Sequence, residues 1–197
     1  MAVITKLQVD ASNEQLIVSA TSSGITQDGE TSLHHKFTKI YVDTCCTFNC
    51  KNEPSSKALI KTLTADDFNG NWINGDLTDH TIPFSDIIVE DVLNEVLFVW
   101  IEEITCDEKG NQLGNYEVTY SFDVTMHIQS LYSILLNRIS INECECKPDC
   151  SDVNFMLAFE GFNLAKTLQD YRQMCYYWQI LHKNKTTISS NGCGCNS

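Results

Sequence analysis

Five cysteines near the C-terminus form the pattern with the clearest potential for chemistry. They occur as Cys144-x-Cys146-x3-Cys150 and as Cys193-x-Cys195. Two C-x-C pairs brought together would offer four thiolates, which suit tetrahedral zinc, with Cys150 as a spare or alternative ligand. The spacing counts against this metal site, because structural zinc sites favour two to four residues between paired cysteines. Zinc, free thiols and disulfides therefore all remain open.

A second group of cysteines lies in the first half of the chain. It comprises Cys45, Cys46 and Cys50, with Cys106 as a possible fourth member. Buried thiols near strand ends are the simpler interpretation, and the zinc interpretation is weaker here than for the C-terminal group.

Acid–base groups that might support catalysis are few. The candidates are the pair His34-His35, His80 close to Asp79, and the pair Asp66-Asp67. Adjacent histidines on a strand point to opposite faces, and carboxylates in so acidic a chain are expected to be solvated loop residues. The sequence contains no P-loop, GxGxxG, GxSxG or HExxH motif. We therefore predict that the protein is not an enzyme.

The elements that would position these residues change type along the chain. Residues 1–126 show mainly the two-residue alternation of strands, with strands expected at residues 4–9, 16–18 and 37–42. Residues 66–83 read as a polar loop rich in glycine and asparagine, with Trp72 as an anchor. We predict an N-terminal antiparallel β-sandwich or barrel-like domain.

A long β-hairpin is expected at the end of this domain. Its arms are residues 92–105 and 116–126, and they flank the turn sequence Asp107-Glu108-Lys109-Gly110-Asn111. In the second arm Tyr120, Phe122 and Val124 point to one face, and polar residues point to the other. We predict that this hairpin, residues 92–126, mediates oligomerisation.

After Met126 the apolar residues follow helical spacing. Helices are expected at residues 127–141, from Ser151 or Asp152 to about Leu168, and from Gln169 or Asp170 to about His182. The predicted fold class is thus α+β, with a β-rich ring or tail domain at 1–126 and a helical module with a cysteine-rich tail at 127–197.

Charge divides at the same point. The chain has 26 acidic and 13 basic residues, a formal net charge of −13. Residues 127–197 hold six of each, so residues 1–126 carry the whole excess. This charge balance argues against binding of duplex DNA and against adsorption to an anionic membrane, since both need clustered lysine and arginine.

The N-terminal residues have no apolar segment and no cleavage site typical of a signal peptide, and no apolar run is long enough to span a membrane. We therefore expect folding in a reducing cytoplasm, where structural disulfides are disfavoured.

The C-terminal third resembles a known viral module. Its run FMLAFEGFNLAKTLQDYRQMCYYWQILHKNK, the pair Tyr177-Trp178 and the final CGC are similar to the C-terminal module of virion structural proteins in crAss-like phages of gut Bacteroidetes. The opening AVITKLQVDASNEQLIVSATSS is similar to the start of a phage tail or neck β-domain.

The resemblance implies a non-enzymatic virion protein, repeated in a neck or tail ring that connects the portal to the tail. The implied partners are further copies of the chain, the portal and adjacent ring or tail proteins. DNA would pass through the channel without specific binding, and assembly would take place in the host cytoplasm. The competing hypothesis is a cytoplasmic zinc-binding adaptor or regulatory module, in which the cysteines are the working part.

Overall fold

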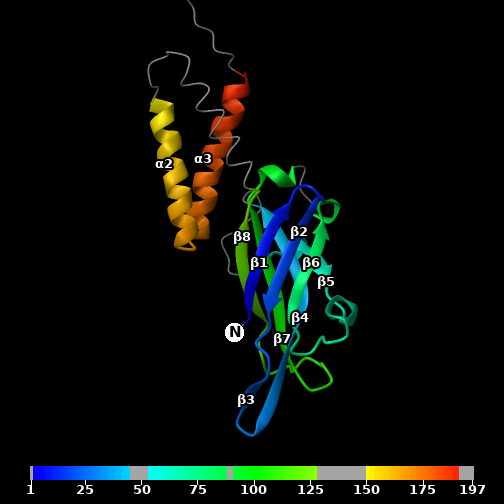
Figure 1. The fold of residues 1–197 in the computed structure, drawn as a ribbon. Helices are drawn as coiled ribbons and strands as arrows, with labels where there is room; N and C mark the ends of the chain where they lie inside the picture. The colour runs from blue at the N-terminus through cyan, green and yellow to red at the C-terminus, as the bar shows by residue number, and fades with distance from the viewer. Residues whose placement is uncertain (1, 45–52, 88–90, 128–149, 191–197) are drawn as a thin grey trace, which may run out of the picture. The chain divides into compact units, whose positions relative to one another are not determined.

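The computed structural model describes residues 2–44, 53–87, 91–127 and 150–190. The chain divides into two compact units, residues 1–127 and 128–197, and each is considered by itself below. The fold is α+β, with two antiparallel sheets that form a curled half-barrel and two C-terminal helices (Figure 1).

Among its described residues, the first unit has eight strands in two antiparallel sheets. One sheet has the order β1-β2-β6, and the other has the order β3-β4-β7-β8, with β5 paired to β4. The strand bounds are β1 Val3–Asp10, β2 Gln15–Thr21, β3 Thr26–Asp28, β4 Thr31–Thr44, β5 Leu59–Thr62, β6 Leu77–Pro83, β7 Leu97–Cys106 and β8 Thr119–Thr125. Short 3-10 turns lie at η1 Ser56–Ala58, η2 Ala65–Phe68, η3 Phe84–Asp86 and η4 Val92–Asn94.

Strand alternation places one continuous apolar core between the two sheets. Leu16 and Val18 of β2 point into it from one sheet, and Ile40 of β4 with Val99 and Ile101 of β7 point into it from the other. All five side chains are fully buried. Burial of this apolar surface is the main source of the stability of the unit.

The predicted hairpin is present, with shorter arms than the alternation suggested. β7 pairs with β8 in register from Leu97 opposite Thr125 to Glu103 opposite Thr119. β7 also pairs with β4 along its other edge, so this arm lies inside the sheet. At the turn, the Asp107 carboxylate accepts hydrogen bonds from the backbone N–H groups of Lys109 and Asn111, both at 2.8 Å.

The segment read as a polar loop at residues 66–83 contains a strand, which the sequence prediction missed. β6 pairs with β2, and its residues Leu77 and Ile82 are buried in the core. Few apolar residues mark this strand, because only one of its faces is covered. The anchor role of Trp72 is confirmed: its indole N–H donates to the Phe37 carbonyl at 2.9 Å, and the Lys36 ammonium lies 3.8 Å from its ring centre.

The described part of the second unit is a helical hairpin. α2 spans Cys150–Thr167 and α3 spans Tyr171–Ser190, which ends eight residues beyond the predicted His182. Their shared seam buries Ala158, Phe162 and Ala165 of α2 against Met174 and Trp178 of α3. The helix expected at residues 127–141 lies, apart from His127, outside the described residues. None of the described helices is long and apolar enough to cross a membrane.

Candidate interaction surface

Helix α2, together with Leu168 directly after its last residue, carries a second apolar row beside the seam that packs on α3. Leu157, Gly161, Leu164 and Leu168 recur at spacings of four, three and four residues, which places them on one face of a helix. We call this row the leucine stripe. Its three leucines are 58, 61 and 68% exposed, although leucine usually lies in the interior of a protein. The stripe therefore has the composition of a core but the exposure of a surface.

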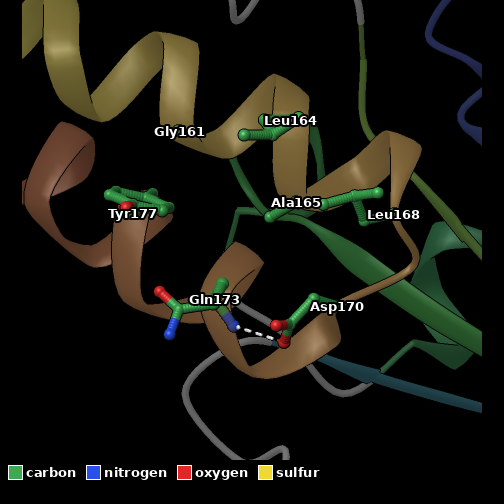
Figure 2. A pocket seen from close by; sticks show the side chains of 7 residues that line it. All are labelled: Gly161, Leu164, Ala165, Leu168, Asp170, Gln173 and Tyr177. Carbon is green, nitrogen blue, oxygen red and sulfur yellow. Dashed lines mark hydrogen bonds between the residues drawn. The ribbon is translucent and has the colours of Figure 1, made fainter.

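A hollow of about 130 Å³ opens between this stripe and α3, and we call it the α2 hollow (Figure 2). Its α2 side is formed by Gly161, Leu164, Ala165 and Leu168, and its α3 side by Asp170, Gln173 and Tyr177. The four α2 residues stand at positions i, i+3, i+4 and i+7. This is the four-residue arrangement into which one side chain of a facing helix inserts in a coiled coil.

Gly161 and Tyr177 together give the hollow its inner wall. A Cβ atom at position 161 would lie 2.5 Å from Tyr177 Cζ, so the ring can lie against α2 because residue 161 is glycine. Tyr177 is half-buried, whereas its neighbour Tyr176 is 57% exposed, with the two rings edge to face. The Tyr176 ring is therefore largely accessible to solvent.

The tight turn between the helices fixes the other end of the hollow. Gln169 has a left-handed backbone (φ 55°), and the Asp170 carboxylate accepts a hydrogen bond from the backbone N–H of Gln173 at 3.1 Å (Figure 2). Asp170 thus caps α3, as the sequence predicted.

The β-unit, by contrast, buries charge. Glu102 of β7 is 5% exposed and accepts hydrogen bonds from Lys39 Nζ at 2.8 Å and from the hydroxyls of Thr38 and Tyr41, both at 2.7 Å. Desolvation raises the pKa of the Glu102 carboxyl, but these donors outweigh it and leave the pKa below its usual value. Because Thr38, Lys39 and Tyr41 all belong to the neighbouring strand β4, these hydrogen bonds tie β7 to β4.

The hydroxyl of Thr26, the imidazole of His35 and the carboxylate of Glu103 lie in a row in space. Thr26 Oγ1 is 2.9 Å from His35 Nε2, but His35 Nδ1 is 4.0 Å from Glu103 Oε2, beyond a hydrogen bond. The Glu103 carboxylate instead accepts hydrogen bonds from Ser22 Oγ at 2.8 Å and Ser23 Oγ at 2.6 Å. It ties the segment after β2 to the sheet, and the three groups do not form a proton relay.

His80 and Asp67 form a third buried polar cluster. His80 Nδ1 and Lys61 Nζ lie 3.7 and 3.4 Å from Asp67 Oδ1, while Asp67 Oδ2 accepts from the backbone N–H of Thr64 at 2.7 Å. Asp67 therefore caps η2 and is nearly buried, where the sequence had suggested a solvated carboxylate. His80 faces Asp67 and not its sequence neighbour Asp79, whose carboxylate binds Lys6 at 2.8 Å.

Comparison with known families decides what kind of protein carries these features. The family model described as Crassvirus tail hub protein A matches residues 3–196. The chain belongs to this family. No curated protein matches it. Membership confirms the resemblance drawn from residues 154–197, and it makes the chain a structural protein of a crAss-like phage tail.

The predicted metal ligands are not tested by the described part of this tail protein. Cys144, Cys146, Cys193 and Cys195 lie outside the described residues, and Cys150 is the first residue of α2. Within the described residues no three potential ligands gather into a metal-binding group.

Cys45, Cys46 and Cys50 lie outside the described residues, whereas two further cysteines and the pair His34-His35 are described. Cys106 of β7 and Cys175 of α3 are buried, and burial raises the pKa of the Cys106 thiol. His34 and His35 contact Asn74 and Thr26, respectively, at 2.9 Å. The leucine stripe is the functional feature that sequence reasoning missed, although the 157, 161, 164, 168 spacing was legible in α2.

Proposed function

We propose that this tail hub family member is a subunit of an oligomeric ring in the neck or tail that connects the portal to the tail. The observation that carries the proposal is the leucine stripe of α2. A tail component that leaves three leucines exposed on one helix face has a surface suited to docking on another virion protein. Its helical hairpin is the docking element in this proposal.

The β-hairpin supplies a second contact between subunits. β8 has β7 as its one hydrogen-bonded neighbour among the described strands, so it is a terminal strand of its sheet. A terminal strand can continue a sheet into the next molecule. Thr119 and Asp123 at this edge are exposed, and the hairpin at 92–126 would join neighbouring subunits through this strand and not through a free arm.

The charge of the β-region fits a ring through which DNA passes. Residues 1–126 carry 7 basic and 20 acidic residues, so their net charge is −13. Carboxylates along a channel repel the phosphate backbone and prevent specific binding. In this proposal the β-region lines or rims the channel, the protein has no catalytic role, and particles assemble in the host cytoplasm.

Imaging of tagged particles tests the ring and its position. A short epitope inserted at the exposed turn Gly29-Glu30, between β3 and β4, would be labelled with an antibody fragment and located by cryo-electron microscopy. We expect several labels arranged symmetrically at the junction of portal and tail. Labels at a distant part of the tail, or one label per particle, would contradict the ring at that junction. Carboxylates placed on the outer surface would remove the channel role.

A further inference from the structure

We infer that Asn69 is a site of spontaneous covalent modification, at which the side-chain amide is lost and a carboxylate is gained, and that the fold protects Asn74 from the same reaction. Both asparagines precede a glycine, in the sequence NGNWING at residues 69–75. An asparagine before glycine is especially prone to this reaction, because glycine has no side chain to hinder attack by its own backbone nitrogen.

The reaction uses only the chain itself and water. The backbone nitrogen of the glycine loses its proton and attacks Cγ of the asparagine, so that a C–N bond forms and the Cγ–Nδ2 bond breaks as ammonia leaves. Water then opens the resulting cyclic imide at either carbonyl, which gives aspartate or isoaspartate. The asparagine side chain must therefore be free to turn towards the peptide bond that follows it.

The backbone explains why this reactive pair occurs twice in one loop. Asn69 and Asn74 both have left-handed backbones, with φ of 51 and 55°, a region that asparagine enters more often than most residues do. Gly70 also has a positive φ, of 87°. At Gly75 a Cβ atom would lie 1.8 Å from the backbone oxygen of Asn71, so only glycine fits there. The turns thus require the residue types that make the loop reactive.

Strand β4 holds the Asn74 carboxamide through both of its polar atoms. Asn74 Nδ2 donates to His34 Nδ1 at 2.9 Å, and Asn74 Oδ1 accepts from the backbone N–H of His35 at 3.0 Å. The backbone N–H of Asn74 also donates to the His35 carbonyl, at 2.6 Å. Attack at Cγ would break the two side-chain bonds, and the carboxylate that results has no hydrogen to donate to His34. The fold therefore opposes the reaction at Asn74.

Asn69 is exposed at the end of η2, and its side chain has no hydrogen-bond partner among the described residues. The backbone N–H of Gly70 donates to the Ala65 carbonyl at 3.1 Å, and that of Asn69 donates to the Asp66 carbonyl at 3.4 Å. The end of so short a 3-10 helix opens locally, because few hydrogen bonds hold it. Opening releases the Gly70 nitrogen for attack, and the product adds a negative charge to an exposed turn of the acidic β-unit.

The test follows both asparagines by peptide mapping while the purified full-length chain is incubated at 37 °C and pH 8. Chymotrypsin cleaves after Phe68, Trp72 and Leu77, which places the two asparagines on separate peptides, and conversion raises the mass of a peptide by about 1 Da. In the folded chain Asn69 should convert about tenfold faster than Asn74, because more hydrogen bonds must break at Asn74. In urea the two rates should agree within about twofold, because unfolding removes the bonds to β4.

Two neighbouring histidines provide a matched pair of variants. His34→Ala removes the acceptor of the Asn74 amide and should speed conversion at Asn74 about fivefold, with the rate at Asn69 unchanged. His35→Ala keeps the backbone N–H that binds Asn74 Oδ1, so both rates should stay within about twofold of the original. Asn69→Gln should abolish the fast conversion, because the longer side chain closes a larger ring less easily. Circular dichroism checks that each variant is folded.

Three results for the folded chain would overturn the inference: equal rates at the two asparagines, faster conversion at Asn74, or no conversion at Asn69 over a period in which the unfolded chain converts. A His34→Ala chain in which Asn74 remains as slow as before would overturn it as well. None of these results bears on the proposed ring, which depends on where labelled subunits lie in the particle.

Discussion

The two units of this tail protein distribute polar and apolar side chains in opposite ways. The β-unit buries carboxylates: Glu102 and Glu103 are 5 and 2% exposed, and each is surrounded by donors from neighbouring segments. The helical unit exposes leucines: Leu164 and Leu168 are more than 60% exposed. The β-unit thus pairs its buried carboxylates internally, whereas the helical hairpin presents apolar surface.

This difference has a simple physical origin. Two packed sheets enclose a core between two layers, so a strand such as β7 can be covered on both faces. Two helices share one seam, and a helix with apolar residues on more than that seam must expose the remainder. The contrast is consistent with the proposal that the helical hairpin is the docking element.

The largest expected effect comes from removing a core aromatic from either unit. Phe37→Ala in β4 and Phe162→Ala in α2 delete fully buried rings, and each should cost about 3–5 kcal/mol. If the units are independent, Phe37→Ala lowers the melting temperature of the β-unit alone, and Phe162→Ala lowers that of the helical unit alone. Differential scanning calorimetry resolves the two transitions. A single transition shifted by both substitutions would contradict separate stability.

The next effect compares two ion pairs of equal length and different burial. Lys39–Glu102 and Lys6–Asp79 both have N–O distances of 2.8 Å, but Glu102 is nearly buried while both side chains of the second pair are exposed. Glu102→Gln should destabilise the β-unit by about 2 kcal/mol because it weakens charged hydrogen bonds to a buried group. Asp79→Asn should cost less than about 1 kcal/mol. Urea denaturation measures both, and equal losses would show that burial is not the deciding variable.

The buried Lys39–Glu102 pair also makes the stability of the β-unit depend on pH. The folded-state pKa of Glu102 is below its ordinary value, so the unfolded chain binds more protons at acidic pH. The contribution of Glu102 is therefore complete above its ordinary pKa of about 4.5 and is lost as the pH falls through the lower folded value. Glu102→Gln should flatten the stability curve in that acidic range, whereas a slope unchanged by the substitution would contradict the assignment.

The accuracy of the sequence predictions differs between the two units, and the reason is again which faces of each strand or helix are covered. Alternation predicted the central strands, and Asp107 predicted the turn, because those residues are covered on defined faces and their signals are local. β6 was missed, because Asp79 and the other polar residues of this strand outnumber its apolar residues and weaken the alternating pattern. The stripe was equally local but was not singled out, since a sequence does not reveal which of two apolar faces is covered.

The charged networks could not have been predicted at all. Glu102 meets Lys39 and Tyr41 across 63 and 61 positions of the chain, and Asp67 of η2 meets His80 of β6 across the intervening loop. Such contacts depend on strand register, which follows from the whole fold. Conversely, the N-termini of α2 and α3 were predicted closely. For α3 the signal is local, because Asp170 caps the helix through a hydrogen bond from the backbone N–H of Gln173, three residues away.

A smaller effect tests the packing that forms the hollow. Gly161→Ala places a methyl group against the Tyr177 ring, and this overpacking should exceed the roughly 1 kcal/mol gained in helix propensity. We expect a net destabilisation of the helical unit by about 1 kcal/mol. In a Tyr177→Ala background the same substitution should instead stabilise by up to about 1 kcal/mol, because the clash is absent. Thermal denaturation of the four proteins of this cycle checks the reversal, and the same sign in both backgrounds would rule out this contact as the reason for glycine.

The smallest expected effect is a pH dependence of the stability of the β-unit near neutrality, which distinguishes it from the helical unit. Burial lowers the pKa of His80, opposed by Asp67 and assisted by Lys61, and its Nε2 atom has no hydrogen-bond partner. The folded protein therefore binds fewer protons than the unfolded chain, whose histidine pKa is 6.5. The stabilising contribution is present above pH 6.5 and declines as the pH falls toward the lower folded value.

His80→Gln should reduce this decline in the β-unit without abolishing it, because burial also lowers the pKa of His35. Calorimetry between pH 5 and 7.5 measures both transitions. The β-unit transition should shift with pH in the original chain and less in His80→Gln. An equal decline with and without His80 would mean that the His80 imidazole carries none of the pH response, which would then come from His35 and from the carboxylates of the β-unit.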